Sequence, residues 1–378
     1  MEIGFCLFKY FPFGGLQSDF LAIAKKCQER GHNIHVYTRS WQGEVPQGFH
    51  VHLLKTNSIS NIGKDVAFIK KLCLKLQKDQ PHIVVGFNKI PGLDVYFAAD
   101  SCYARKVESK PSPIKKLVSR HRHKLRLEAS LFQPPFPHLL LIAPQQMQDF
   151  EKFYAIKQDN IHMLPPGIDA NLKEYSPCNN RTIVKELKLA DGTFLILMVG
   201  SGFQTKGVDR SIRALSSLPK NLLSKTHLII AGKGKKAFFV NMAKRLDIEE
   251  NVTFLGARSD VHSLYQQSDM LLHPSYNESA GKVILEATVV GLPVITTANC
   301  GYAFYIEKAR NGIVIPAPFD QNCLNKALFD MRQVSDLYER WGKNGWEYAR
   351  KNDLYTQHDR AVDVIESVGK NKGNARRK

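Results

Sequence analysis

Short apolar runs alternate with longer segments of helical periodicity along the whole chain. In the first half, the runs of strand length lie at 3–8, 34–38, 51–54, 83–87, 96–99, 139–143 and 161–164. In the second half, they lie at 194–199, 227–231, 252–255, 270–273, 294–297 and 312–315. Short runs rich in Val, Ile and Leu between helices are typical of parallel strands covered on both faces. The pattern therefore predicts an α/β chain with two doubly wound, Rossmann-like domains.

A segment rich in helix breakers separates the two series of strands. Pro165-Pro166-Gly167 ends the last run of the first half, and Pro177, Cys178, Asn179 and Asn180 follow shortly after it. Such residues favour turns and linkers. We expect an N-terminal domain over 1–168 and a C-terminal domain over 181–345. A C-terminal helix over 346–368 and a basic, disordered tail over 369–378 are expected to follow.

The composition supports two folded cores in a chain of 378 residues, of which 43% are hydrophobic and 23% charged. No apolar run reaches the roughly 18–20 residues that span a bilayer. The start of the chain lacks the basic and apolar regions of a signal peptide. The seven cysteines are scattered and never spaced as C-x-x-C, which favours reduced thiols over a disulfide framework or a zinc site. We therefore expect a cytoplasmic protein.

The net charge of +18 is concentrated in two places. Nine bases lie between Arg105 and Arg126, and five lie in Lys370–Lys378. The segment 105–132 combines these bases with apolar residues at helical spacing, and Ser112-Pro113 is a good helix start. A basic amphipathic helix suits an anionic membrane surface. The alternatives are a solvated helix face, an RNA-binding patch, or an apolar stripe that only contacts the core.

The first candidate site motif is Gly14-Gly15, which follows the first predicted strand and precedes a helix over about 17–30. Glycines allow a ligand to approach the backbone closely, and a helix amino terminus stabilises phosphate or a polar sugar. The alternative is a tight turn between strand and helix, because short glycine motifs are common.

A second glycine loop, Gly200–Gly207, occupies the matching position of the second half and carries Lys206. A lysine beside such a loop neutralises phosphate as a point charge. The spacing of a P-loop is absent. The alternative is a surface lysine in a loop between strand and helix.

The third motif is Glu278 and Glu286, separated by seven residues and followed by Gly291-Leu292-Pro293. The backbone amides of Gly281–Val283 are expected to open a helix, where a diphosphate would be stabilised. In an all-helical segment the two carboxylates would be about 80° apart, so they need not share one face. The alternative is that Glu286 pairs with Lys282 one turn earlier.

Paired carboxylates of the type Asp-x-Asp, which hold the divalent ion of many nucleotide-sugar enzymes, are absent from the sequence. We therefore expect neither a metal nor another cofactor. Helix amino termini and lysines would have to stabilise the charge of a diphosphate instead.

Taken together, these motifs resemble the retaining family-4 glycosyltransferases of the GT-B fold, and among them the enzymes that build the lipopolysaccharide core. The resemblance extends from about residue 3 to 368. It rests on the Glu278/Glu286 pair with Gly291–Ile295 and on four longer strings, which are 11–17, 86–100, 164–168 and 206–211. It implies two Rossmann-like domains facing a cleft, with the C-terminal helix crossing back to the first domain.

The resemblance also implies a reaction and roles for particular residues. UDP-glucose would donate glucose, with retained configuration, to an inner-core heptose of lipopolysaccharide. Glu286 would hold the ribose, Glu278 would contact the glucose and Lys206 would stabilise the departing diphosphate. The backbone at Gly14, Gly15 and Ala280–Val283 would bind phosphate or sugar, and Asp19 and Asp100 would face the acceptor. Attack on the same face, with the leaving phosphate taking the acceptor's proton, would explain retention without a protein nucleophile.

This chain departs from the family pattern in its positive charges. Close relatives commonly place Arg beside the loop lysine, where this chain has Thr205, and Ser201 fills another usual Arg position. Lys173, Lys233 and Arg258 are the candidate substitutes for the second positive charge. Lys282 replaces a common aliphatic residue and would add phosphate charge or alter the donor preference.

Two alternatives to a lipopolysaccharide glucosyltransferase follow from the sequence. The same fold would accept another UDP-sugar, such as UDP-galactose or a UDP-N-acetylhexosamine. A basic, non-catalytic nucleic-acid-binding protein is the other alternative, although carboxylates such as Glu278 and Glu286 weaken binding to phosphates. We expect no nucleic-acid partner, and we expect a peripheral protein on the cytoplasmic face of the inner membrane that contacts anionic lipid through 105–132.

Overall fold

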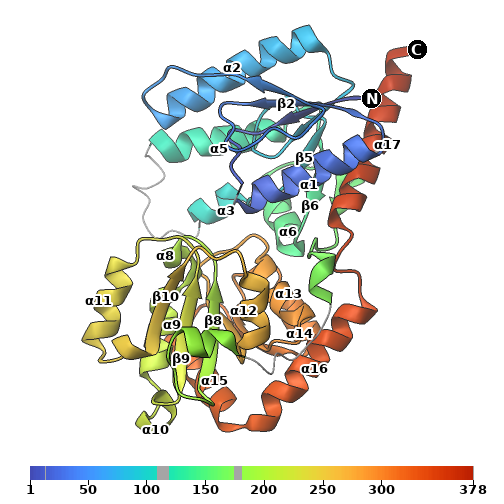
Figure 1. The fold of residues 1–378 in the computed structure, drawn as a ribbon. Helices are drawn as coiled ribbons and strands as arrows, with labels where there is room; N and C mark the ends of the chain where they lie inside the picture. The colour runs from blue at the N-terminus through green and yellow to red at the C-terminus, as the bar shows by residue number, and fades with distance from the viewer. Residues whose placement is uncertain (13, 109–118, 174–180, 378) are drawn as a thin grey trace. The chain divides into compact units, whose positions relative to one another are not determined.

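The computed structural model describes residues 1–12, 14–108, 119–173 and 181–377. Two compact units divide the chain: Met1–Pro165 together with Thr356–Lys378, and Pro166–Tyr355 (Figure 1). Each unit holds one parallel sheet with helices on both faces, so the predicted α/β class with two Rossmann-like domains is confirmed.

The first unit contains a seven-stranded sheet of order β3-β2-β1-β4-β5-β6-β7 in which every paired strand is parallel. Its strands are β1 (Glu2–Cys6), β2 (Asn33–Thr38), β3 (Phe49–Leu53), β4 (Ile83–Gly86), β5 (Val95–Phe97), β6 (His138–Leu141) and β7 (Ile161–Met163). Its helices are α1 (Gly15–Glu29), α2 (Asn61–Asp79), α3 (Tyr103–Glu108), α5 (Ser119–Leu131), α6 (Pro144–Phe153) and α17 (Gln357–Arg377). A 3₁₀ turn, η1 (Gln158–Asn160), precedes β7.

Aromatic side chains form the centre of the first core, between the sheet and α1. The ring of Phe20 on α1 meets Phe5 of β1 edge to face, with ring centroids 5.7 Å apart, and Phe87 after β4 at 5.5 Å. Phe87 in turn stacks on Phe97 of β5 at 5.2 Å. All four rings are buried, and such pairs add to the stabilisation that burial of apolar area provides.

The C-terminal helix returns to the first unit, as expected, and lies beside α1 (Figure 1). Charged pairs hold the two helices together: Lys26 contacts Asp359 at 2.7 Å, and Arg30 contacts Asp363 at 2.8 Å. Nε2 of His358 also lies 2.9 Å from the carboxylate of Asp19, which is buried on α1. The side chain of Asp19 therefore joins α1 to α17.

Two expectations for the C-terminal region were wrong. The single helix expected over 346–368 is interrupted between Lys351 and Gln357, where the carboxylate of Asp353 accepts a hydrogen bond from the N–H of Tyr355 at 3.0 Å and favours a turn. The tail expected to be disordered over 369–378 is helical as far as Arg377. Lys372 explains part of this order, because its ammonium lies 2.6 Å from the carboxylate of Asp94.

The second unit contains a six-stranded sheet of order β10-β9-β8-β11-β12-β13, again parallel throughout. Its strands are β8 (Phe194–Val199), β9 (Thr226–Ala231), β10 (Val252–Gly256), β11 (Met270–His273), β12 (Val294–Thr297) and β13 (Gly312–Ile315). Its helices are α7 (Thr182–Glu186), α8 (Phe203–Lys206), α9 (Val208–Ser216), α10 (Lys220–Leu223), α11 (Ala237–Arg245), α12 (Val261–Gln267), α13 (Lys282–Val289), α14 (Ala303–Ala309), α15 (Gln321–Gln333) and α16 (Ser335–Lys351). The 3₁₀ turns are η2 (Ala170–Lys173) and η3 (Glu249–Asn251).

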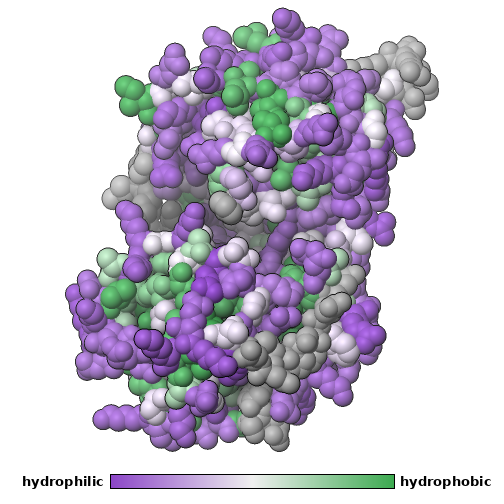
Figure 2. Space-filling model, in the orientation of Figure 1, coloured by the Kyte–Doolittle hydropathy of each residue, from purple (hydrophilic) through white to green (hydrophobic). Residues whose placement is uncertain are grey.

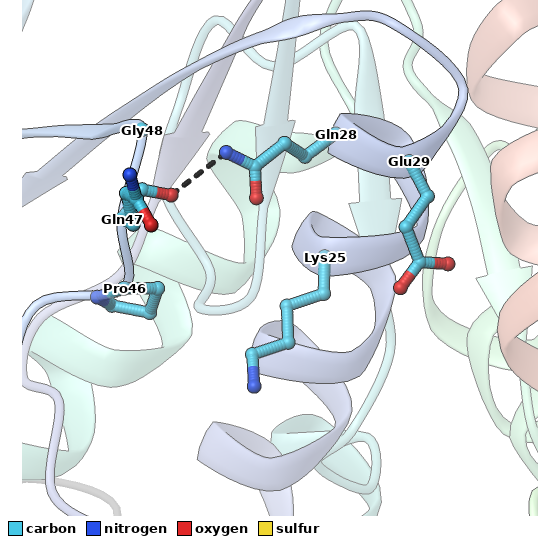
Figure 3. Close-up of a pocket in the computed structure, with 6 residues that line it drawn as sticks. All are labelled: Lys25, Gln28, Glu29, Pro46, Gln47 and Gly48. Atoms are coloured by element: carbon cyan, nitrogen blue, oxygen red, sulfur yellow. Dashed lines mark hydrogen bonds between the residues drawn. The ribbon is translucent and has the colours of Figure 1, made fainter.

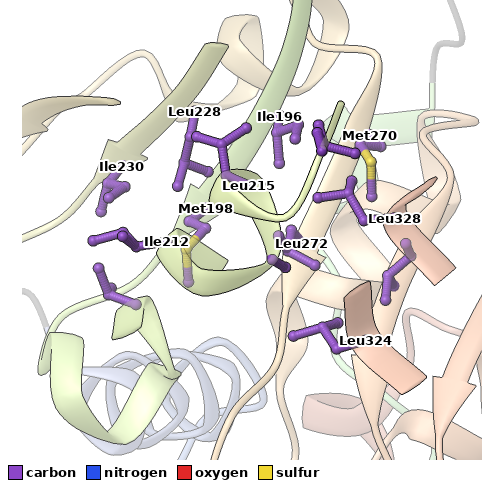
Figure 4. Close-up of a cluster of buried hydrophobic side chains, with 14 of the residues drawn as sticks. Ile196, Met198, Ile212, Leu215, Leu228, Ile230, Met270, Leu272, Leu324 and Leu328 are labelled. Atoms are coloured by element: carbon purple, nitrogen blue, oxygen red, sulfur yellow. The ribbon is translucent and has the colours of Figure 1, made fainter. Parts of the chain in front are cut away.

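Aliphatic side chains from one face of this sheet and from α9 and α15 form the second core. Figure 4 shows Ile196 and Met198 of β8 among Leu228 and Ile230 of β9, with Leu272 of β11 beside them. Hydrophilic side chains cover most of the face seen in Figure 2. The carboxyl ends of β8 and β11, which are neighbours in this sheet, carry the loops with Lys206 and Glu278.

Buried His227 predicts a pH dependence of stability. This residue of β9 lies 2.8 Å from the hydroxyl of Thr253 on β10, and burial lowers its pKa to about 4. The unfolded chain binds a proton at His227 near pH 6.5 and the folded chain only near pH 4, so stability falls as the pH drops between these values. The expected loss from this residue is on the order of 3 kcal/mol.

Thermal unfolding of the wild type and of His227→Gln, followed from pH 7 to pH 4, tests this expectation. The variant keeps a polar side chain opposite Thr253 but does not titrate, so its midpoint should fall less steeply with pH. Parallel curves for the two proteins would show that His227 is not the cause.

Candidate functional site

Two loops at the carboxyl ends of neighbouring strands bring Lys206 and Glu278 together in the second unit. Gly200–Gly202 leads from β8 into α8, which carries Lys206 at its end. The segment 274–281 leads from β11 to α13 and carries Glu278. The crevice outside the carboxyl ends of parallel strands is the usual place for a ligand in an α/β sheet.

Lys206 and Glu278 form an ion pair, with exposed side-chain fractions of 18% and 20%. Nε2 of His273, the last residue of β11, lies 3.4 Å from the same carboxylate oxygen, and this histidine is fully buried. Burial alone would raise the pKa of Glu278, but the contact with His273 and the charge of Lys206 outweigh it and lower the pKa to about 2. Glu278 is therefore an anion at neutral pH, beside a cation that it holds in place.

His273 was missed by sequence reasoning, although it directly follows an apolar strand. Burial lowers its pKa, so the ring is neutral and its Nε2–H donates to Glu278. Nδ1 of the ring is buried and has no hydrogen-bond partner among the described residues. In the sequence, His273 is only a polar residue at the end of an aliphatic strand, and its contact with Glu278 depends on the path of the loop that follows.

The loop after β11 is held by the start of α9. Gly207 has φ +76°, and a Cβ at this position would overlap the carbonyl oxygen of Pro274. Arg210 donates to the carbonyl oxygens of Pro274 and Ser275 at 3.1 and 3.2 Å. Its guanidinium lies over the rings of Tyr276 and Phe319, 3.6 Å from each centroid. Sequence reasoning missed Arg210, which fixes the loop that carries Glu278.

The start of α13 lies where the sequence predicted it, after Gly281. This residue has φ +85°, and a Cβ there would overlap the Sγ of buried Cys300. The amides of Gly281, Lys282 and Val283 stand at the amino terminus of the helix, which favours an anion. The backbone of Ala280 is itself engaged, because its carbonyl accepts from the N–H of Tyr302 at 2.8 Å.

Glu286 lies inside α13 and its side chain faces α12. The hydroxyl of Tyr265 donates to its carboxylate at 2.7 Å. Burial raises the pKa of Glu286, while Tyr265 and the charge of Lys282 oppose this shift. Tyr265, which sequence reasoning also missed, is the hydrogen-bond partner of Glu286. The two carboxylates therefore contact different elements: Glu278 contacts Lys206 of α8, and Glu286 contacts Tyr265 of α12.

The candidates for a second positive charge have different surroundings. Lys233 is exposed in the loop after β9, and its N–H lies 3.3 Å from the hydroxyl of Ser201. Arg258 is paired with Asp260 at 2.7 Å and with Glu186 at 2.8 Å, which raises its pKa, so a phosphate would compete with two carboxylates there. Thr205 is exposed on α8, and its carbonyl accepts from the N–H of Tyr276. The side chain of Lys173 lies outside the described part of the structure.

The remaining predicted residues lie in the first unit. Gly14 precedes α1 with extended backbone, and Gly15 is the first residue of the helix. Asp100 is exposed beyond the carboxyl end of β5. Asp19 is only 4% exposed and contacts His358, so the structure gives it a structural role, and its catalytic role stays a prediction.

The basic segment 105–132 is described only in part. Residues 105–108 belong to α3 and 119–131 to α5, whereas the expected helix start at Ser112-Pro113 lies outside the described residues. No helix in the described ranges combines the length and the apolar character needed to cross a bilayer. In the same ranges, no group of three His, Cys, Asp or Glu side chains is arranged to hold a metal ion.

A cavity of about 660 Å³ lies elsewhere, on the first unit (Figure 3). Lys25, Gln28 and Glu29 of α1 line one side, and Pro46, Gln47 and Gly48 line the other. The amide of Gln28 donates to the carbonyl of Gln47 at 2.8 Å across it. None of the predicted site residues lines this cavity, so it is separate from the site of the second unit.

Comparison with known proteins tests the resemblance. Over 97% of its length, the chain is 43% identical to the lipopolysaccharide glucosyltransferase WaaG of Escherichia coli K12, and the match covers 98% of that protein. The chain belongs to the glycosyltransferase family of WaaG. Family models agree: "Glycosyltransferase Family 4" matches residues 13–172 and "Glycosyl transferases group 1" matches 179–348.

Solved structures of related proteins identify the fold of this chain. The crystal structure of WaaG, described as a glycosyltransferase involved in lipopolysaccharide biosynthesis, matches with a TM-score of 0.90 at 42% identity, over 96% of this chain and 99% of the other. Anabaena HepE in complex with UDP and glucose matches with a TM-score of 0.71 at 19% identity, over 97% and 100% of the two chains. The likeness to HepE shows the fold alone. The GT-B fold and the glycosyltransferase activity expected from the sequence are confirmed.

Proposed function

We propose that this glycosyltransferase transfers glucose from UDP-glucose to a heptose of the lipopolysaccharide inner core, with retained configuration. The observation that carries the proposal is the match of nearly the whole chain to WaaG, whose name states a lipopolysaccharide acceptor and glucosyl transfer. The Lys206–Glu278 pair, the amino terminus of α13 and Glu286 supply groups that suit a nucleotide-sugar donor.

The donor would contact three groups of the second unit. The amides at the start of α13 and the ammonium of Lys206 would stabilise the diphosphate, whose charge grows as the sugar departs. The ionised carboxylate of Glu278 would accept hydrogen bonds from glucose hydroxyls. Glu286, with one oxygen engaged by Tyr265, would accept hydrogen bonds from the ribose.

The transfer step would use no protein nucleophile. The bond between the anomeric carbon and the phosphate oxygen breaks, and the acceptor hydroxyl forms its bond on the same face. The hydroxyl proton passes to the departing phosphate. Stabilisation of that phosphate is therefore the main contribution expected from the protein.

The first unit would bind both the acceptor and the membrane. Asp100 and the Gly14-Gly15 turn would face the acceptor. The bases of 105–132 would bind anionic lipid on the cytoplasmic face of the inner membrane, where the lipid-linked acceptor is presented. Loss of binding to vesicles of anionic phospholipid as the salt concentration rises would support this location, whereas binding that salt does not change would contradict it.

A donor panel tests the proposed reaction. The acceptor is lipopolysaccharide truncated at the heptoses, offered with UDP-glucose, UDP-galactose and a UDP-N-acetylhexosamine in the presence of EDTA. Transfer of glucose alone supports the donor and a reaction that needs no divalent ion. Transfer of another sugar would contradict UDP-glucose as the donor, and Lys282 and Thr205 would then be the residues expected to alter the donor preference. Absence of both transfer and nucleotide binding would favour the basic nucleic-acid-binding protein.

Replacing Glu286 by Gln is expected to weaken donor binding more than turnover. The amide keeps the size of the side chain but is a poorer acceptor for ribose hydroxyls, and one lost charge-assisted hydrogen bond corresponds to roughly tenfold in affinity. Calorimetric titration with UDP-glucose gives the dissociation constant directly. The matched control is Glu307→Gln on α14, a carboxylate of the same unit with an exposed side chain. Equal affinity of Glu286→Gln and wild type would remove Glu286 from the donor site.

A further inference from the structure

Glu128 of α5 is a fully buried carboxylate in the first unit, surrounded by donors from three other segments. It forms an ion pair with Lys89. Its other contacts are the N–H of Tyr103 at 2.6 Å, the N–H of Ala104 at 2.8 Å, the hydroxyl of Tyr154 at 2.8 Å and the thiol of Cys102 at 3.6 Å. The site described above uses none of these residues.

A buried charge persists only when its partners replace the lost hydration. Burial would raise the pKa of Glu128, but Lys89 and the two backbone amides outweigh that effect and lower it. The carboxylate is therefore ionised, and it accepts on both oxygens. All of these donors contact the same carboxylate. The segments that carry the donors are therefore held in place by Glu128.

Two of these groups of donors adjoin the loop that carries Asp100. Lys89, while paired with Glu128, also donates to the carbonyl of Ser101 at 2.8 Å. The amides of Tyr103 and Ala104 begin α3 directly after this loop. On its other side, Gln146 donates to the carbonyl of Ala98 at 2.6 Å. The backbone on both sides of Asp100 is thus fixed, while the side chain of Asp100 is exposed.

The same face of α5 contacts Tyr103 at two further points. The hydroxyl of Tyr103 lies 2.6 Å from Nδ1 of His121, and the ammonium of Lys124 lies 5.1 Å from the centre of its ring. Positions 121, 124 and 128 follow the spacing of one helix face. The basic helix α5 is therefore packed against the start of α3, directly after the Asp100 loop, with the buried Glu128 between them.

We propose that Glu128 is a positioning residue for the acceptor: it fixes the Asp100 loop to the basic helix α5, so that the surface that meets the lipid also sets the place of the acceptor hydroxyl. The inference rests on the proposed function, because it takes the first unit as the acceptor side. Glu128 itself touches no substrate.

Glu128→Gln tests the proposal with the full chain and a deacylated, soluble acceptor that ends in heptose, so that membrane binding has no part in the result. The amide keeps the shape but directs an NH₂ group at donors and leaves Lys89 without its counter-charge. We expect the KM for the acceptor to rise about tenfold, while the dissociation constant of UDP-glucose, whose proposed contacts lie in the other unit, stays within about twofold. Glu128→Asp, which keeps the charge, should restore part of the acceptor KM.

The matched control is Glu151→Gln, which removes the same charge from the exposed surface of α6, where Glu151 accepts a hydrogen bond from the amide of Gln158 at 2.8 Å. It should leave the acceptor KM at the wild-type value. If Glu128→Gln folds poorly, Lys89→Met removes the link to Ser101 and should raise the acceptor KM in the same direction. An unchanged acceptor KM in folded Glu128→Gln, or a parallel loss of acceptor and donor binding, overturns the proposal. Failure of the wild type to use this acceptor would instead overturn the proposed function.

Discussion

Replacement of Lys206 by alanine is expected to lower kcat by roughly 10²–10³-fold, with a much smaller change in the KM for UDP-glucose. The ammonium is held beside the ionised Glu278, at the carboxyl end of the sheet where a diphosphate would lie. Negative charge on the diphosphate grows as the bond to glucose breaks, so a fixed cation stabilises the transition state more than the bound donor. Steady-state kinetics with UDP-glucose and the heptose acceptor measure both constants.

Two further variants distinguish loss of the stabilising cation from a general effect of removing a lysine and from the effect of an unpaired carboxylate. Lys244→Ala removes an exposed lysine of α11 in the same unit and should retain wild-type kinetics. Lys206→Ala combined with Glu278→Gln removes both charges, so that no half-buried carboxylate is left unpaired. If the double variant regained the wild-type kcat, the loss in Lys206→Ala would come from the unpaired Glu278, and Lys206 would not be the stabilising cation.

Replacement of Gly207 by alanine is expected to destabilise the second unit by about 3 kcal/mol. Positive φ costs a residue with a Cβ about 1–2 kcal/mol, and overlap with a neighbouring atom adds about as much again. The overlapped atom is the backbone carbonyl of Pro274, which Arg210 holds in place and which therefore has little room to move. For a unit of this size the thermal midpoint should fall by about 6–12 °C.

Gly192→Ala is the matched control for this substitution. Gly192 lies in the same unit with φ +78°, close to the +76° of Gly207, but a Cβ there would meet no atom within 4 Å. Its midpoint should fall by only about 3–6 °C, half the loss expected for Gly207→Ala, because the backbone conformation alone is strained. Scanning calorimetry measures the midpoint of each variant. Equal falls of the midpoint in the two variants would show that overlap with Pro274 does not add to the destabilisation.

The fold was predictable from the sequence because its strands are short, aliphatic and bounded by breakers. Gly31 and Gly291, both with positive φ, lie just beyond the ends of helices α1 and α13, and the strands that follow begin at Asn33 and Val294. Such signals act through residues that are close along the chain, so they do not depend on the tertiary contacts around them. The C-terminal tail was predicted wrongly, because part of its order comes from the contact of Lys372 with Asp94, a residue 278 positions earlier in the chain.

The candidate site was predictable only in part. Lys206, Glu278 and Glu286 stand in motifs whose glycines and helix start are visible in the sequence. Their partners His273, Tyr265 and Arg210 are not, because each lies in an ordinary strand or helix. A side chain acquires a partner from another element only when the sheet order places the two together.

The sequence by itself therefore determined the two α/β domains, the glycine loops and the identity of the charged residues that suit a nucleotide-sugar donor. These follow from periodicity, from turn chemistry and from the spacing of residues close along the chain. Only the tertiary structure decided that Asp19 joins α1 to α17, that Glu278 is an anion held between Lys206 and His273, and that Glu128 is a buried charge. Burial and the approach of distant charges set the state of a carboxylate, and both exist only once the chain has folded.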